Sequence, residues 1–252
     1  MSGAPAERQS SPRAPSPDGP GLVGLIGAMP EELERLLGLA HDVTRERVGP
    51  FELVHGVLEG VRVVMATCGI GKVNAAALAQ ALAAAGVVRV IVTGVAGGVD
   101  PALRVGDIVV SVDAVQHDVD VTGLGYALGE VPGEPRVWEA DPSLRDAASA
   151  AARDVAERDG VRVVTGRVAS GDVFVADPAR VALLRERFEA SCAEMEGAAV
   201  AQVCARWGVP WVVVRSVSDT ADHTAEVDFR AFTAVAAERA VAVVLGALRR
   251  LV

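Results

Sequence analysis

Residues 61–98 read VRVVMATCGIGKVNAAALAQALAAAGVVRVIVTGVAGG, and they indicate the fold class. Val61–Thr67 is a short apolar run of the kind that forms a buried strand. After the glycine-rich Gly69–Gly71, the alanine-rich Val73–Ala85 has high helix propensity. Val88–Gly94 is a second continuous apolar run, which favours another buried strand. Alternation of strand and helix indicates an α/β fold.

The same alternation continues on both sides of this stretch. Pro30 stands at the first helical position of residues 29–40, and Asp141 is a candidate N-cap for a helix through about Arg158. Further strands are expected at Gly21–Ala28, Val48–Glu59, Asp107–His117, Val161–Ala169, Ser191–Glu196 and Pro210–Val217, and further helices at Pro178–Phe188, Gly197–Trp207 and Val227–Val252. Residues 118–138 have no period and are expected to be irregular.

We therefore expect one α/β domain over residues 21–252, with a mixed central sheet flanked by helices. Residues 1–20 are rich in Pro, Ser, Gly and Ala and predict a disordered leader. This segment has no apolar core of a secretory signal, so a cytoplasmic location is expected.

Composition excludes several classes of partner. The 252-residue chain carries 24 Lys and Arg against 33 Asp and Glu, and a net charge of −9 argues against nucleic-acid binding. No apolar run reaches about 18 residues without a charge or a glycine, so no membrane span is expected. The cysteines Cys68, Cys192 and Cys204 lack metal-type spacing and are expected to be reduced, buried thiols.

Two motifs at strand ends carry carboxylates, and each has two interpretations. Glu194 and Glu196 flank Met195 where a strand gives way to a helix. They either complement the helix dipole or accept hydrogen bonds from the vicinal hydroxyls of a ribose. In the second motif, which spans Arg215 to Asp219, the aspartate either forms an Asx turn or acts as an acid or base.

Other familiar sites do not match. The glycines at 69–71 and 94–98 fit neither a dinucleotide-binding GxGxxG nor a P-loop, so they are expected to admit a ligand close to the backbone. His117, Asp118 and Asp120 have no second histidine at ligand spacing, so we expect no metal and no other cofactor. A Gly-x-Ser-x-Gly elbow of a serine hydrolase is also missing from the sequence.

Several motifs together resemble one family in order and spacing. They are GLIGAMPEELERLL (24–37), TCGIGKVNAA (67–76), VTGVAGGVDPALRVGDIVVSVDAVQHDVDVTGLGY (92–126), SGDVFV (170–175), CAEMEGAAVAQVC (192–204) and VPWVVVRSVSDTAD (209–222). This set closely resembles the 5′-methylthioadenosine/S-adenosylhomocysteine nucleosidases of the nucleoside phosphorylase/hydrolase superfamily, from about residue 22 to 250.

The resemblance implies hydrolysis of an N-glycosidic bond to adenine and a 5-thioribose derivative. It implies that Glu32 activates the attacking water and that Asp219, oriented by Ser218, protonates N7 of adenine. Glu32 must then be ionised and Asp219 protonated near neutral pH. Glu196 would bind the ribose diol. Further substrate contacts are implied for Met29, Leu53, Phe174, Val175, Met195, Arg215 and Phe229.

The resemblance also implies a homodimer, because a tyrosine-bearing loop of this family reaches across the dimer interface. Tyr126, the only tyrosine in the chain, occupies that place together with Val121. We therefore expect these two residues near the partner's site.

Alternative activities remain open on the sequence. A purine nucleoside phosphorylase needs cations for phosphate, but Val92 stands where related phosphorylases carry an arginine, and the carboxylates of Glu31 and Glu32 repel phosphate. In the nucleosidase family a serine is common where this chain has Val95, and a phenylalanine where it has Leu124, so the resemblance leaves the exact substrate open. Relatives that cleave futalosine or aminodeoxyfutalosine share the mechanism, so a hydrolase of menaquinone synthesis is the second hypothesis. A catalytically silent nucleoside-binding protein is a third hypothesis, but such a protein has no need for Glu32, Glu196 and Asp219 together.

Overall fold

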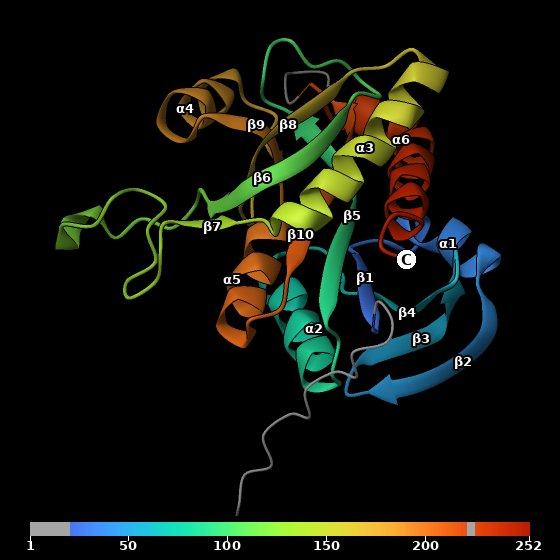
Figure 1. Cartoon of the computed structure of the whole chain (residues 1–252). Coiled ribbons are helices and arrows are strands. Elements are labelled where there is room, and N and C mark those ends of the chain that lie inside the picture. Colours follow the sequence, from blue (N-terminus) through green and yellow to red (C-terminus); the bar gives the residue numbers. More distant parts are fainter. Residues whose placement is uncertain (1–20, 221–224) are drawn as a thin grey trace, which may run out of the picture.

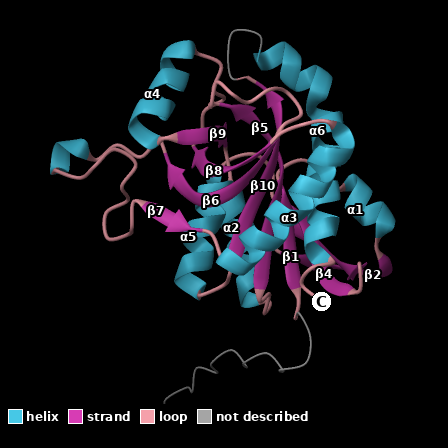
Figure 2. Ribbon diagram, turned by 45° about the horizontal axis from the view of Figure 1, so that its top comes forward, coloured by secondary structure: helices cyan, strands magenta, loops and turns pink. Residues whose placement is uncertain are grey.

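The structure is a computed structural model that describes residues 21–220 and 225–252; for residues 225–231 it describes the backbone alone. The expected leader at residues 1–20 lies outside the described residues. Within the described part, the strands form one mixed ten-stranded sheet with helices packed on both faces (Figures 1 and 2). The expected fold class is therefore confirmed.

The strands are β1 (Val23–Gly27), β2 (His41–Val48), β3 (Phe51–Leu58), β4 (Val61–Thr67), β5 (Arg89–Gly98), β6 (Ile108–Gln116), β7 (Val137–Glu139), β8 (Val163–Ser170), β9 (Ala190–Glu194) and β10 (Trp211–Asp219). The α-helices are α1 (Glu34–Leu39), α2 (Lys72–Ala84), α3 (Pro142–Asp159), α4 (Pro178–Phe188), α5 (Gly197–Trp207) and α6 (Ala225–Leu248), and the short 3₁₀ helices are η1 (Pro30–Glu32) and η2 (Thr122–Leu124).

Strand β5 organises the sheet. It pairs in parallel with β1 along one edge and with β10 along the other, and its last residues pair antiparallel with β9. Pairings of β10 with β6, β6 with β8 and β8 with β9 then close a ring of strands. In this ring Gly97 of β5 lies opposite both Asp219 of β10 and Ala193 of β9, so the ends of three strands meet at one rim.

Local sequence explains several elements directly. Asp141 caps α3 as predicted, because its Oδ1 accepts a hydrogen bond from the amide of Leu144 at 2.9 Å. Helices α4 and α5 and strand β4 have the predicted limits. Helices α3 and α6 pack together on one face, and α2 and α5 pack together on another.

The strand expected over Val48–Glu59 is present as β3, but it begins at Phe51, and the strand β2 before it was not predicted. The chain turns at Gly49, where φ is +59°, and β2 and β3 form an antiparallel hairpin with Val48 opposite Phe51. β2 was missed because it is polar and exposed along its whole length, so no alternating pattern marks it. The helix expected over residues 29–40 is divided into η1 and α1, with Pro30 at the first helical position as predicted.

Three further parts of the chain differ from the sequence-based expectations. The segment 118–138, expected to be irregular, contains η2 and the short strand β7, which pairs with β6 through Trp138 and Ala114. The last helix begins at Ala225 and ends at Leu248. Pairing with β9 extends β5 to Gly98, beyond the predicted end at Gly94.

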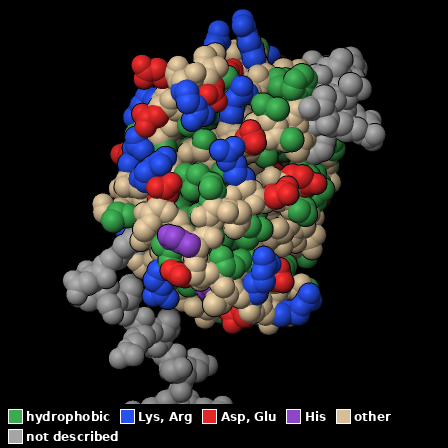
Figure 3. All heavy atoms as spheres, turned by 90° about the vertical axis from the view of Figure 1, so that its right-hand side faces the viewer, with side chains coloured by type: hydrophobic (Ala, Val, Ile, Leu, Met, Phe, Trp, Pro, Cys, Tyr) green, Lys and Arg blue, Asp and Glu red, His purple; other side chains and the backbone are tan. Residues whose placement is uncertain are grey.

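The three cysteines are buried free thiols, as predicted. Burial raises the pKa of Cys68 and of Cys204 to about 12. On the face drawn in Figure 3, Lys and Arg side chains are intermixed with Asp and Glu and with hydrophobic side chains. Across the described residues, the helices are too short or too polar to cross a membrane.

Candidate active site

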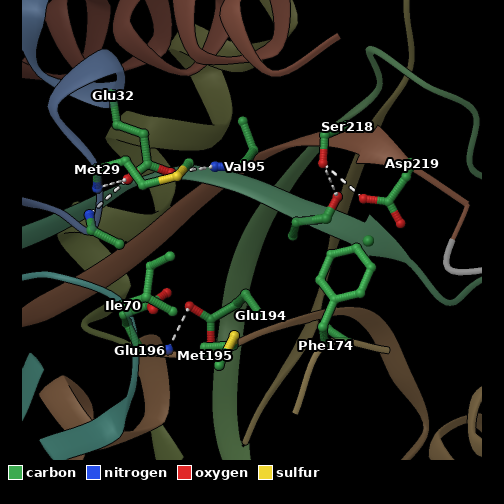
Figure 4. Close-up of a pocket in the computed structure, with 14 residues that line it drawn as sticks. Met29, Glu32, Ile70, Val95, Phe174, Glu194, Met195, Glu196, Ser218 and Asp219 are labelled. Atoms are coloured by element: carbon green, nitrogen blue, oxygen red, sulfur yellow. Dashed lines mark hydrogen bonds between the residues drawn. The ribbon is translucent and has the colours of Figure 1, made fainter. Parts of the chain in front are cut away.

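A cavity of about 260 Å³ opens at the rim where β1, β5, β9 and β10 end. Figure 4 shows Glu32 on one side of it, beside Met29, and Asp219 on the other, beside Ser218. Its walls also include Val95. This is the position at which α/β sheets bind ligands, because the carboxyl ends of parallel strands converge there.

Glu32 is held in the turn that follows β1. One carboxylate oxygen, Oε2, accepts hydrogen bonds from the amides of Ala28 (2.6 Å) and Met29 (3.0 Å). The other, Oε1, accepts one from the amide of Val95 (3.0 Å). The side chain is buried, and three amide donors stabilise a negative charge on it.

Gly94 makes this arrangement possible. A Cβ atom at this position would overlap Oε1 of Glu32 and Nη1 of Arg215. The missing side chain therefore admits two side chains of the protein itself. This refines the expectation that the glycine brings the backbone close to a ligand.

Arg215 is the electrostatic centre of the site. It is fully buried in β10, and its Nη2 forms an ion pair with Glu194 and lies 3.3 Å from Oε2 of Glu196. Its Nη1 lies 3.9 Å from Oε1 of Glu32 and donates a hydrogen bond to the carbonyl of Thr93 at 3.2 Å. Burial opposes the charged form, but the three carboxylates outweigh it and raise the pKa of Arg215.

The two interpretations of the Glu194-Met195-Glu196 motif apply to different residues. Glu194 accepts hydrogen bonds from the amide of Gly197 (2.8 Å to Oε2) at the start of α5 and from the hydroxyl of Ser170, so it complements the helix N-terminus. Glu196 accepts a hydrogen bond from the amide of Gly71 at 2.9 Å. Burial and the neighbouring Glu194 raise the pKa of Glu196 to about 7. Both carboxylates line the cavity.

Asp219 and Phe174 mark the opposite side of the cavity. Ser218 donates a hydrogen bond to Oδ2 of Asp219 at 2.9 Å, and its Oγ lies 3.4 Å from the carbonyl oxygen of Ala96. A small adjoining cavity of about 40 Å³ is bounded by Val175 as well as by Phe174 and Asp219. Asp219 itself is buried, whereas Phe174 is half-exposed at the entrance.

The structure therefore brings most of the predicted site residues to this cavity and its small adjoining cavity. They are Met29, Glu32, Phe174, Val175, Met195, Glu196, Ser218 and Asp219, with Arg215 directly behind them. Sequence reasoning assigned no site role to Ile70, which also lines the cavity, and it left the role of Glu194 open between the helix dipole and a ligand. Ile70 lies within the GIG segment that was noted only for its glycines.

Three other predicted residues do not line this cavity, and the side chain of a fourth lies outside the described residues. Tyr126 and Val121 belong to the segment around η2, which extends away from the body of the molecule (Figure 1) and does not line the cavity of its own chain. Leu53 is fully buried in β3 as part of the core and does not line the cavity either. Phe229 is in α6, and its side chain lies outside the described residues.

Asp118, considered above as a possible metal ligand, is occupied by other partners. Its Oδ1 accepts a hydrogen bond from Nζ of Lys72 at 2.6 Å, and its Oδ2 accepts one from the amide of Asp172 at 2.9 Å. In the part of the chain that the structure describes, no three His, Cys, Asp or Glu side chains are grouped so that they could hold a metal ion.

Comparison with known proteins gives the family. The model of the phosphorylase superfamily matches residues 22–249, so the chain belongs to that superfamily. Within it, the chain belongs to the 5′-methylthioadenosine/S-adenosylhomocysteine nucleosidase family. It is 45% identical to the nucleosidase of that name from Geobacillus kaustophilus over 226 residues, which are 89% of this chain and 95% of the relative.

Solved structures agree with this assignment. The Neisseria meningitidis 5′-methylthioadenosine/S-adenosylhomocysteine nucleosidase, crystallised with methylthio-immucillin-A, has a TM-score of 0.86 and 40% identity, covering 90% of this chain and 98% of its own. A futalosine hydrolase mutant of Helicobacter pylori has a TM-score of 0.84 and 34% identity, with coverage of 90% and 98%. The resemblance expected from the sequence is confirmed.

Proposed function

We propose that this chain hydrolyses 5′-methylthioadenosine and S-adenosylhomocysteine to adenine and a 5-thioribose derivative. As a member of the nucleosidase family, the chain is an enzyme, a purine N-ribosyl hydrolase. The observation that carries the proposal is a single cavity with buried carboxylates on opposite sides, Glu32 and Asp219, in different surroundings (Figure 4). Two carboxyl groups in different roles on either side of the scissile bond are what an inverting glycosidase uses.

Glu32 activates the attacking water in this proposal. Three amide donors and the nearby guanidinium of Arg215 hold its carboxylate at the cavity, where in this role it accepts a proton from the attacking water. Its position in the cavity wall beside Met29 and Val95 supports this role, because a water bound there would lie within reach of the carboxylate.

Asp219 acts on the leaving group. Breaking the C1′–N9 bond places negative charge on the purine, and a proton delivered to N7 neutralises it. The hydroxyl of Ser218 donates a hydrogen bond to Oδ2 of Asp219, which orients this carboxyl group, and in this proposal the carboxyl group delivers the proton to N7. The aromatic ring of Phe174 stacks on the purine, and Val175 bounds the far end of its pocket.

Glu196 binds the ribose between these two ends. A carboxylate accepts hydrogen bonds from both hydroxyls of a vicinal diol, and its negative charge favours an oxocarbenium-like transition state. Met195 packs beside the sugar in this arrangement.

Water is the better nucleophile in this cavity. The charge of Arg215 is already neutralised by Glu194 and Glu196, and Val92 is a buried core residue of β5. Phosphate would therefore approach Glu32 without a free cation from these residues, which disfavours phosphorolysis.

A second candidate is hydrolysis of futalosine or aminodeoxyfutalosine. Similarity to the futalosine hydrolase structure of Helicobacter pylori favours it, because the same fold and more than 30% identity are shared. Val95 lines the cavity, and Leu124 is exposed on the segment around η2. Both residues differ from those common in 5′-methylthioadenosine/S-adenosylhomocysteine nucleosidases. Comparing the rates of hydrolysis of the candidate nucleosides therefore decides between the two substrate classes.

We further propose that the enzyme is a homodimer located in the cytoplasm and that it serves methionine salvage. Tyr126 is partly exposed and Val121 lies near it on the segment that extends away from the body of the chain. A loop of this kind supports a role at the site of a second copy. Its removal should change the oligomeric state in analytical ultracentrifugation.

The test is release of adenine, followed by chromatography, from 5′-methylthioadenosine, S-adenosylhomocysteine and futalosine, with and without phosphate. We expect release from the first two without phosphate. A strict phosphate requirement would replace the hydrolase with a phosphorylase, and a preference for futalosine would favour the second candidate. Tight nucleoside binding without any product would favour a catalytically silent protein.

Variants then test the roles of the residues. Glu32→Gln and Asp219→Asn should each lower kcat by roughly 10²–10⁴-fold, the contribution of one proton-transfer group. The matched control is Glu31→Gln, because Glu31 is an exposed neighbour in the same turn. Near-normal turnover by either site variant would remove the role given to that residue.

A further inference from the structure

Three residues next to the cavity form a closed ring of hydrogen bonds. The amide of Lys72 donates to Oδ1 of Asp172 (2.7 Å), and the amide of Asp172 donates to Oδ2 of Asp118 (2.9 Å). Nζ of Lys72 donates to Oδ1 of Asp118 (2.6 Å), which completes the ring. The three residues come from the start of α2, the segment after β6 and the segment after β8.

The ring is partly shielded from solvent. The Lys72 and Asp118 side chains are 15% and 20% exposed, so their ion pair is screened less than one at the surface. Lys72 is the only lysine of the chain. Its Nζ also donates to Oε1 of Gln116 (2.9 Å), whose amide donates to Gln202 on α5 (2.7 Å). The network thus reaches the helix that begins directly after Glu196.

Two residues of the ring, Lys72 and Asp172, stand next to parts of the chain that form the proposed site. Gly71 precedes Lys72, and its amide donates the hydrogen bond to Oε1 of Glu196. Phe174 lies two residues after Asp172 and lines the cavity. Glu196 and Phe174 are the proposed ribose and purine contacts, so the ring joins the two segments that hold opposite parts of one nucleoside.

Glycine at position 71 belongs to this arrangement. Its φ is +103°, and a Cβ there would lie only 3.1 Å from Oδ1 of Asp172. The glycine therefore permits the turn that places one amide on Glu196 and the next on Asp172.

We propose that Lys72, Asp118 and Asp172 are positioning residues that set the separation between the ribose contact and the purine contact. The proposal rests on the proposed function for the identity of the ligand. If the ring sets this separation, its loss penalises a ligand that spans both contacts. A ligand that occupies only the purine end is affected far less.

The experiment compares two ligands in two variants, Lys72→Met and Asp172→Ala. Asp172 is exposed, so its variant tests the ring even if Lys72→Met folds poorly. Calorimetric dissociation constants for 5′-methylthioadenosine and adenine are measured in an Asp219→Asn background, where turnover is slow. The control is Arg185→Met, which removes an exposed cation from α4.

We expect nucleoside affinity, and kcat/KM in the active background, to fall on the order of 10- to 100-fold in both ring variants, as for a misplacement of about 1 Å. Adenine affinity should change far less, and Arg185→Met should change neither ligand. Equal losses for the two ligands, or no loss for either, would overturn the proposal. Failure of the unsubstituted enzyme to release adenine would instead reject the proposed function. The dissociation constants of the two ligands would still test whether the ring positions the two contacts.

Discussion

Replacing Arg215 with methionine would remove the guanidinium that faces three buried carboxylates. The side chain has no exposed surface, and it contacts Glu194 and Glu196 and lies 3.9 Å from Glu32. Methionine fills part of the same space in β10 but supplies no charge. The carboxylates would then repel one another in a poorly solvated cavity.

The expected loss of stability is large. Removing one partner of a buried ion pair costs about 3–5 kcal/mol, against a total unfolding free energy of about 5–15 kcal/mol for a typical domain. The Arg215→Met variant should therefore fold, but with only a small remaining free energy of unfolding.

The loss of stability should also depend on pH, and the pKa of Glu196 decides whether the loss grows or shrinks as pH rises. The pKa of Glu196 is raised from its ordinary value of 4.5 to about 7, which corresponds to about 3 kcal/mol. Because the folded-state pKa is the higher one, this stabilising contribution is full below pH 4.5 and is lost as pH rises through about 7. Arg215 lowers the pKa of Glu196, so its removal extends the loss to higher pH.

Urea unfolding at pH about 5.5 and about 8, on either side of the pKa of Glu196, provides the measurement. We expect Arg215→Met to be more destabilising at the higher pH. Adding Glu194→Gln, which removes one buried charge, should recover part of the loss, so the two substitutions should not be additive. The reasoning is refuted by a loss below about 1 kcal/mol at the higher pH, by an equal loss at both, or by simple additivity.

Two further predictions concern single positions. Gly94→Ala should lower the rate of adenine release by about 100-fold or more, because its Cβ would displace Glu32 and Arg215 from each other; wild-type kcat in this variant would contradict that account. Asp141→Ala should lower the unfolding free energy in urea by about 1 kcal/mol and leave kcat/KM unchanged, because it removes the N-cap bond to Leu144 on a helix that does not line the cavity. A change in kcat/KM would show that α3 is coupled to the site.

Elements governed by local interactions were predictable. The limits of α5 and the N-cap of α3 follow from helix propensity and capping over a few residues. Strand β2 could not be predicted, because it is polar and exposed and pairs with β3 alone among the described strands. The extension of β5 to Gly98 also depends on a distant partner, β9.

The candidate site divides in a similar way. Its location was predictable, since the carboxyl ends of parallel strands meet at one edge and the motifs stood at those ends. The sequence could not predict which carboxylate of the Glu194-Met195-Glu196 motif binds the N-terminus of α5 and which remains for a ligand. The two residues have the same chemistry, and only the packing of Ser170, Gly197 and Gly71 around them distinguishes their roles.

Pattern and motif in the chain alone establish the α/β class, the family resemblance and the set of residues to consider, because these depend on residue type and spacing. The electrostatic grouping around Arg215 and the hydrogen-bonded ring around Lys72 exist only in the folded molecule. Lys72 and Asp172 are 100 residues apart along the chain, and sheet pairing brings their segments within hydrogen-bonding distance. Interactions between charges depend on separation in space and on burial, and neither can be read from the order of residues.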